Sequence, residues 1–113
     1  MTYLKDAEET LSLSDDELYV NLGAQLQPSS FVRPPKDQLH KYALNWLNSQ
    51  MQSLQSAICE SDTVKRHTKE EAVLLIAVVA DIIAAKFNLT NPATCAALLV
   101  RVGLNKICSE TWD

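Results

Sequence analysis

The chain contains very little glycine, with only Gly23 and Gly103 among its 113 residues. A phosphate-binding loop needs several glycines close together, so this class of nucleotide site is excluded. Long loops and tight β-turns also favour glycine, because glycine adopts backbone angles that other residues avoid. The scarcity therefore favours a helical protein with short connections.

Positive charge is also scarce, since ten Lys and Arg residues stand against fourteen Asp and Glu residues and give a net charge of −4. The densest basic cluster has only four groups, Lys65, Arg66, His67 and Lys69. A nucleic-acid-binding face usually comes with an isoelectric point above about 9, whereas this acidic chain has a pI of about 5.1. We expect no nucleic-acid partner.

Long hydrophobic runs are missing. The longest uninterrupted apolar run covers residues 72–80, whereas a helix needs about 20 apolar residues to cross a bilayer. Asp81 follows this run directly, and a charge inside the membrane is costly. The polar, acidic N-terminus also lacks a leader pattern. We expect no stable membrane insertion, and a membrane-associated helical hairpin is kept as an alternative.

Cysteine is limited to three residues, and no two of them have C-x-x-C spacing. An odd number of cysteines without a leader predicts reduced thiols and a cytoplasmic location. Cys95 and Cys108 lie in apolar segments, where cysteine usually acts as a small buried hydrophobe. Cys59 lies at the end of a predicted helix and is the candidate exposed thiol.

The sequence contains no motif for catalysis or metal binding. A nucleophile needs a base beside it, and the only two histidines, His40 and His67, have no characteristic spacing to a cysteine. No H-x-x-H, E-x-x-H or HExxH pattern offers metal-ligand spacing. We expect a non-catalytic protein with no metal and no cofactor. A small enzyme with an unrecognised Cys/His site is the alternative.

Two apolar segments, residues 70–87 and 93–108, dominate the C-terminal half. A Thr-x-x-Glu capping box begins at Thr68, before the first segment. Asn91 and Pro92 are typical of the N-cap and the first helical residue of the second segment. Because the connector is short, we expect an antiparallel helical hairpin.

Each of these two segments has only a thin polar stripe, so its apolar surface is wider than the roughly 100° of an ordinary amphipathic helix. Asp81 and Arg101 are at similar distances from the connector and form a candidate interhelix ion pair, although both could instead face water. Helices this apolar lie at the centre of a bundle or are covered by another chain.

Upstream, the pattern predicts two more helices. A capping box that begins at Ser14 opens a helix over residues 14–26, and apolar residues at three-and-four spacing predict a long amphipathic helix over residues 36–58. Residues 1–13 are expected to be partly irregular, and residues 59–67 to form a polar loop.

Two segments outside the helices are candidates for contact with a partner. Residues 27–35 form a proline-rich connector, in which Phe31 and Val32 either clamp against the bundle or face a partner. The tail, residues 109–113, carries Trp112, which either docks back or contacts another chain.

Taken together, these features predict one all-α domain over residues 1–113, a four-to-five-helix bundle built around the C-terminal hairpin. The function expected is a small helical protein–protein interaction module, with Phe31, Val32 and Trp112 as its candidate partner interface. It would act as a homo-oligomer, with a dimer as the first expectation, or as an accessory subunit of a larger complex. An ordinary monomeric core is the alternative.

Overall fold

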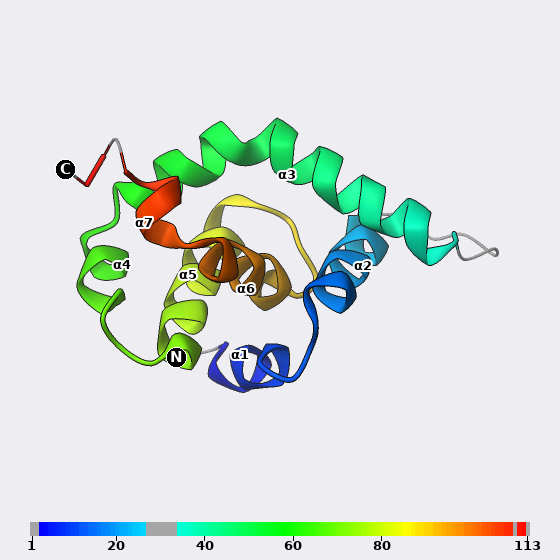
Figure 1. Ribbon diagram of the computed structural model, residues 1–113. Helices are drawn as coiled ribbons and strands as arrows, with labels where there is room; N and C mark the ends of the chain where they lie inside the picture. The colour runs from blue at the N-terminus through cyan, green and yellow to red at the C-terminus, as the bar shows by residue number, and fades with distance from the viewer. Residues whose placement is uncertain (1–2, 27–33, 110, 113) are drawn as a thin grey trace.

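Seven α-helices and no strand make up the part of the chain that the computed structural model describes, residues 3–26, 34–109 and 111–112. This confirms the all-α class, but with more helices than the four or five expected (Figure 1). The helices are α1 (Leu4–Thr10), α2 (Asp15–Leu26), α3 (Lys36–Cys59), α4 (Asp62–His67), α5 (Ala72–Lys86), α6 (Pro92–Val102) and α7 (Leu104–Ile107). None of these helices is long and apolar enough to span a membrane.

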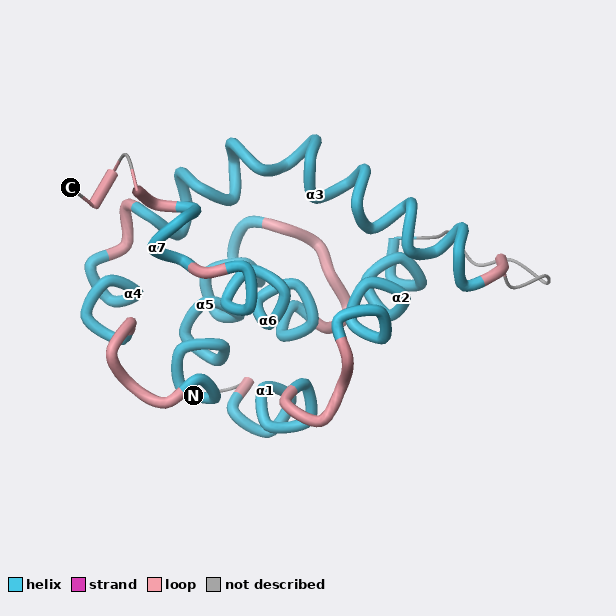
Figure 2. The backbone as a smooth tube through the Cα atoms, in the orientation of Figure 1, coloured by secondary structure: helices cyan, strands magenta, loops and turns pink. Residues whose placement is uncertain are grey.

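Helix α6 lies at the centre of the molecule. Eight consecutive residues of this helix, from Pro92 to Leu99, are buried, so no side of this segment faces solvent. Helices α1, α2, α5 and α7 all contact it, and α3 arches across the outside of this group (Figures 1 and 2). Most of the buried α6 residues are small, which lets the surrounding helices approach closely.

Helix α5 supplies the second large part of the core. Its residues from Leu75 to Ala80 are all buried, together with Ile83. Helix α5 packs against α6, α1, α3 and α4, so its apolar surface is covered by the chain itself. The surplus of apolar surface expected from the sequence is therefore absorbed within one molecule.

Side-chain caps explain where two of the predicted helices begin. The backbone N–H of Glu17 donates to Ser14 Oγ and the N–H of Ser14 donates to Glu17 Oε1, both at 3.1 Å, which confirms the capping box of α2. Asn91 Oδ1 accepts from the N–H of Ala93 at 3.2 Å, which confirms the N-cap of α6.

The capping box predicted at Thr68 is wrong. Helix α5 begins at Ala72, after Glu71, with no side-chain hydrogen bond at its N-cap. The Thr68 hydroxyl instead donates to the carbonyl oxygen of Lys65 at 2.9 Å, because residues 62–67 already form a helix.

A segment predicted as a loop, and another predicted as partly irregular, both contain a helix. The polar loop expected over residues 59–67 contains α4. The backbone N–H of Val64 donates to Ser61 Oγ at 3.4 Å, and the Val64 side chain is fully buried. Helix α1 forms within residues 1–13 and buries Ala7 and Thr10. Both helices are only one or two turns long, and burial of their apolar side chains against the core stabilises them. The sequence pattern of so short a segment does not indicate this burial.

Gly23 lies where α2 meets α3. A Cβ atom added to Gly23 would overlap the carbonyl oxygen of Leu39, so the two backbones are nearly in contact. Glycine destabilises a helix interior by about 1 kcal/mol relative to alanine. The close approach of the two backbones explains why glycine is nevertheless found at position 23.

We predict that Gly23→Ala lowers the free energy of unfolding by at least about 3 kcal/mol, because the neighbouring atoms are backbone and cannot rotate away. Urea denaturation followed by circular dichroism measures the change. Asn21→Ala, at an exposed position of the same helix, serves as the control and should stay within about 0.5 kcal/mol of the parent. A more stable Gly23→Ala variant would show that helix propensity outweighs the contact.

Candidate functional site

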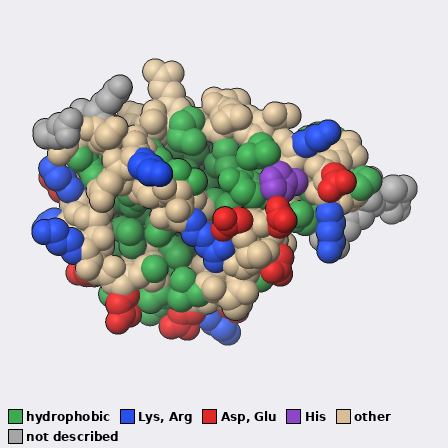
Figure 3. All heavy atoms as spheres, in the orientation of Figure 1, with side chains coloured by type: hydrophobic (Ala, Val, Ile, Leu, Met, Phe, Trp, Pro, Cys, Tyr) green, Lys and Arg blue, Asp and Glu red, His purple; other side chains and the backbone are tan. Residues whose placement is uncertain are grey.

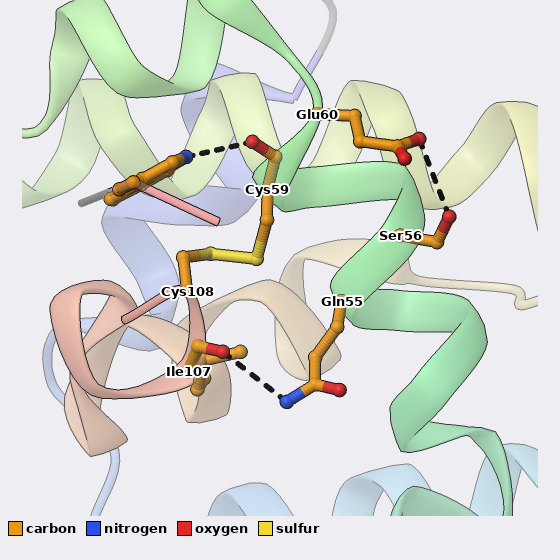
Figure 4. The surroundings of a disulfide bond; sticks show 7 residues. Gln55, Ser56, Cys59, Glu60, Ile107 and Cys108 are labelled. Atoms are coloured by element: carbon orange, nitrogen blue, oxygen red, sulfur yellow. Dashed lines mark hydrogen bonds between the residues drawn. A yellow bond between two sulfur atoms is a disulfide. The ribbon is translucent and has the colours of Figure 1, made fainter. Parts of the chain in front are cut away.

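The C-terminal segment is joined covalently to the end of α3. Cys59, the last residue of α3, and Cys108, which follows α7, form a disulfide across 49 positions of sequence (Figure 4). Both residues are buried, with exposed fractions of 4% and 1%. The prediction of Cys59 as an exposed thiol is therefore wrong, as is that of a reduced Cys108.

Two hydrogen bonds join the same two segments. Gln55 Nε2 donates to the carbonyl oxygen of Ile107 at 3.2 Å (Figure 4). The indole Nε1 of Trp112 donates to the carbonyl oxygen of Cys59 at 2.7 Å. Trp112 thus docks back on α3, half-buried against the core, which is one of the two placements that the sequence left open. We call this set of contacts the C-terminal clasp: Gln55, Cys59, Ile107, Cys108 and Trp112.

The clasp was missed because cysteine spacing carries no information on pairing when no motif is present. One signal was available, since Cys59 and Cys108 each lie at the end of a predicted helix. Two helix ends can meet only in particular packings, however, and the sequence does not specify the packing. The pairing of Cys59 with Cys108 therefore follows only from the tertiary structure.

The third cysteine is chemically quiet. Cys95 is fully buried on α6, and burial raises the pKa of its thiol to about 12, because a thiolate would have to form away from water. At neutral pH the group stays protonated and is a poor nucleophile. This agrees with the expectation that Cys95 acts as a small hydrophobe.

Neither histidine is directed at a cysteine. His40 on α3 stacks with Tyr19, with 4.5 Å between the ring centroids, and its Nδ1 lies 3.4 Å from Asp16 Oδ1. His67 Nδ1 lies 2.6 Å from the carbonyl oxygen of Thr63. With the disulfide formed and Cys95 buried, the contacts of the described residues give no support to a Cys–His nucleophile. No group of three His, Cys, Asp or Glu side chains in residues 3–26, 34–109 and 111–112 is arranged to hold a metal ion.

The ion pair predicted between Asp81 and Arg101 is wrong. Arg101 Nη1 donates to Asp15 Oδ1 at 2.8 Å, and its Nη2 donates to the carbonyl oxygen of Thr10 at 2.9 Å. Asp81 is exposed. The end of α6 lies beside the junction between α1 and α2, and this tertiary contact selects Asp15 as the partner.

Phe31 and Val32, predicted as an interface or a clamp, lie outside the described residues. Within the described part, three large hydrophobic side chains are exposed: Leu11 by 52%, Leu44 by 38% and Val102 by 51%. Leu11 and Val102 directly follow Thr10 and Arg101, so they flank the hydrogen bond that joins α1 to α6. Leu44 lies one turn beyond His40 on α3.

One face of the molecule has a hydrophobic centre. Figure 3 shows hydrophobic side chains gathered between α3 and α1, over the region of α6 and α7, with charged side chains around this area. An exposed apolar area with a polar rim is the usual composition of a protein-binding surface. We call it the apolar face.

A surface hollow with a mainly polar lining lies elsewhere on the molecule. It has a volume of about 630 Å³ and lies between the C-terminal half of α3 and the end of α5. It is lined by Gln50, Ser53, Ser56, Ala57, Glu60, Ser61, Lys86 and Phe87. Side chains of both charges and three serine hydroxyls border it, and Ser56 Oγ donates to Glu60 Oε2 at 3.3 Å.

Comparison with known proteins adds no relative: no family model matches this chain, and no curated protein or solved structure matches it either.

We predict that the native, oxidised protein has no thiol that reacts with Ellman's reagent. The reason is that Cys59 and Cys108 are paired and Cys95 is buried. Denaturant alone should expose one thiol, and reduction in denaturant should expose all three cysteines. A reactive thiol in the native protein would contradict this pairing and restore Cys59 as a candidate.

We further predict that Arg101→Met lowers the free energy of unfolding by about 1 kcal/mol, because it removes a largely exposed ion pair and a hydrogen bond to Thr10. Asp81→Asn should change it by less than about 0.5 kcal/mol, since this side chain is exposed. Thermal or urea unfolding of both variants distinguishes the observed pairing from the one predicted. Equal losses of unfolding free energy in the two variants would argue against the Arg101–Asp15 pairing.

Proposed function

We propose that this chain is a small, non-catalytic protein–protein interaction module that self-associates through its apolar face. The observation that carries the proposal is that Leu11 and Val102, which follow the hydrogen-bonded Thr10 and Arg101 where α1 meets α6, are each about half exposed. Figure 3 shows that the molecule also has a face with a hydrophobic centre. Exposed apolar side chains occurring singly are normal, whereas a gathered area often marks an interface.

The charges near this area fit a protein partner. The Arg101–Asp15 pair and the His40–Asp16 contact are partly exposed and place groups of both signs beside the apolar side chains. In a twofold dimer the same surface patch of each copy faces the other. A patch with charges of both signs can therefore pair its basic groups with the acidic groups of the second copy. An accessory role in a larger complex is the alternative, with the same face against a different chain.

The proposed interface does not depend on helices left uncovered by the fold. Most of the apolar surface of α5 and α6 is covered by the chain's own helices, and Val102, at the end of α6, is the large apolar side chain of these two helices that stays exposed. The same burial weakens the alternative of a membrane-associated hairpin, because most of the apolar surface that would enter lipid is buried in the protein core. The interface proposed here is therefore small and optional.

The cellular location expected from the sequence also needs revision. A cytoplasmic location was expected from unpaired cysteines, but disulfides persist mainly in oxidising compartments. The Cys59–Cys108 disulfide therefore supports an oxidising compartment as the location of the oxidised protein.

We predict that the wild-type protein associates as its concentration rises, and that Val102→Glu weakens this association at least about tenfold, because a charge replaces an apolar side chain at the proposed interface. Light scattering after size-exclusion chromatography across a hundredfold concentration range provides the measurement. Gln52→Glu adds the same charge at an exposed position of α3 and should leave association unchanged. A wild-type protein that stays monomeric throughout would contradict self-association.

A further inference from the structure

The C-terminal segment is connected to the rest of the fold through one special residue. Gly103 alone separates α6 from α7, and its φ of +111° is the only positive φ among the described residues. A Cβ atom added there would meet only Lys106 Cγ, at 3.9 Å. Glycine is therefore required for the backbone conformation and not for close packing, and it provides a pivot between the two helices.

Beyond this pivot, α7 has few contacts of its own. It is a single turn of four residues, which is too short to be stable in isolation. Leu104 is buried and Ile107 is half-buried, whereas Asn105 and Lys106 are exposed. Apart from Cys108, which the disulfide itself holds, Leu104 is the one buried apolar side chain among the described residues of this segment, and Ile107 and Trp112 are half-buried. Their burial offsets only part of the conformational entropy lost when the segment is ordered.

The clasp provides the remaining attachment, and Cys59 is its central residue. The sulfur of Cys59 is bonded to Cys108, and its carbonyl oxygen accepts the hydrogen bond from Trp112. Gln55, one turn earlier on α3, holds the carbonyl oxygen of Ile107. All three links run from the last turn or two of α3 to the segment that follows Gly103 (Figure 4).

We propose that the Cys59–Cys108 disulfide is a redox latch: on reduction by a dithiol, residues 104–112 swing away from α3 about Gly103 and uncover the apolar surface beneath Leu104 and Ile107. The pivot and the small set of other contacts allow local release. Release of the segment removes the contacts of α7 with α6 and α3, whereas the contacts of α6 with α1, α2 and α5 do not involve this segment.

The reaction is a thiol–disulfide exchange. One thiolate of the dithiol attacks a protein sulfur, the S–S bond breaks, and the second thiol of the reductant resolves the mixed disulfide. The protein gains two electrons and two protons and ends with two thiols, while the dithiol is oxidised to a disulfide. Because Cys59 and Cys108 are buried, the attack requires transient opening of the segment, which the Gly103 pivot permits.

Hydrogen exchange measured by mass spectrometry on the full chain, with and without dithiothreitol, tests the latch. Informative amides are those of Cys108 and Trp112, which donate to the carbonyl oxygens of Leu104 and Cys108 at 2.8 and 2.9 Å. We expect exchange over residues 104–112 to become at least about tenfold faster on reduction. After reduction, amides in α2, in α5 and in the middle of α3 should still exchange at least about tenfold more slowly than those over residues 104–112, because the core stays folded.

Two variants are matched controls. The double variant Cys59→Ser, Cys108→Ser should show fast exchange over residues 104–112 without reductant and no response to dithiothreitol. Cys95→Ala retains the disulfide and should keep the full response, which excludes an effect through the buried thiol.

Unchanged exchange over residues 104–112 on reduction would overturn the latch, because the other contacts would then suffice to hold the segment. Equal loss of protection throughout the chain on reduction would also overturn it, since the core would then open together with the segment. The latch does not depend on what the apolar face binds. A monomeric protein with redox-dependent exchange would refute the proposed self-association and leave the latch standing.

Discussion

The burial of α6 on every side is the constraint on which the rest of this structure depends. A helix that is apolar all round is stable in water only if other elements cover its whole circumference. Eight consecutive buried residues, from Pro92 to Leu99, need neighbours in several directions, and four helices provide them. This requirement explains why segments as short as α1 and α7 are ordered, since each is held by the surface it covers and not by its own helix propensity.

The polar contacts act mainly at the ends of helices, where they fix how the covering elements meet α6. Arg101 joins the end of α6 to the α1–α2 junction through Asp15 and Thr10. At the other end, Gln25 Oε1 accepts from the backbone N–H of Asn91 at 2.9 Å and ties α2 to the connector before α6. These bonds are worth about 1 kcal/mol each, so they select one arrangement of a core whose stability comes from burial.

The clasp adds a covalent link to this design. A disulfide that closes a loop of this length, with its cysteines 49 positions apart, destabilises the unfolded chain by about 4 kcal/mol in the chain-entropy model. Domain stabilities are typically about 5–15 kcal/mol, so loss of the bond is compatible with a folded core. The oxidised state therefore has two consequences, a general gain in stability and a local hold on the segment beyond Gly103.

By itself, the sequence determined what depends on neighbouring residues along the chain. The all-α class, the capping box of α2, the N-cap of α6 and the long amphipathic α3 follow from periodicity and local chemistry. The tertiary structure alone decided which distant groups meet. Asp15 and not Asp81 pairs with Arg101, Cys59 is bonded to Cys108, and Gly23 faces the Leu39 carbonyl. The physical reason is that a helix pattern specifies which face is buried, whereas the partner on that face depends on how all the helices share the surface of α6.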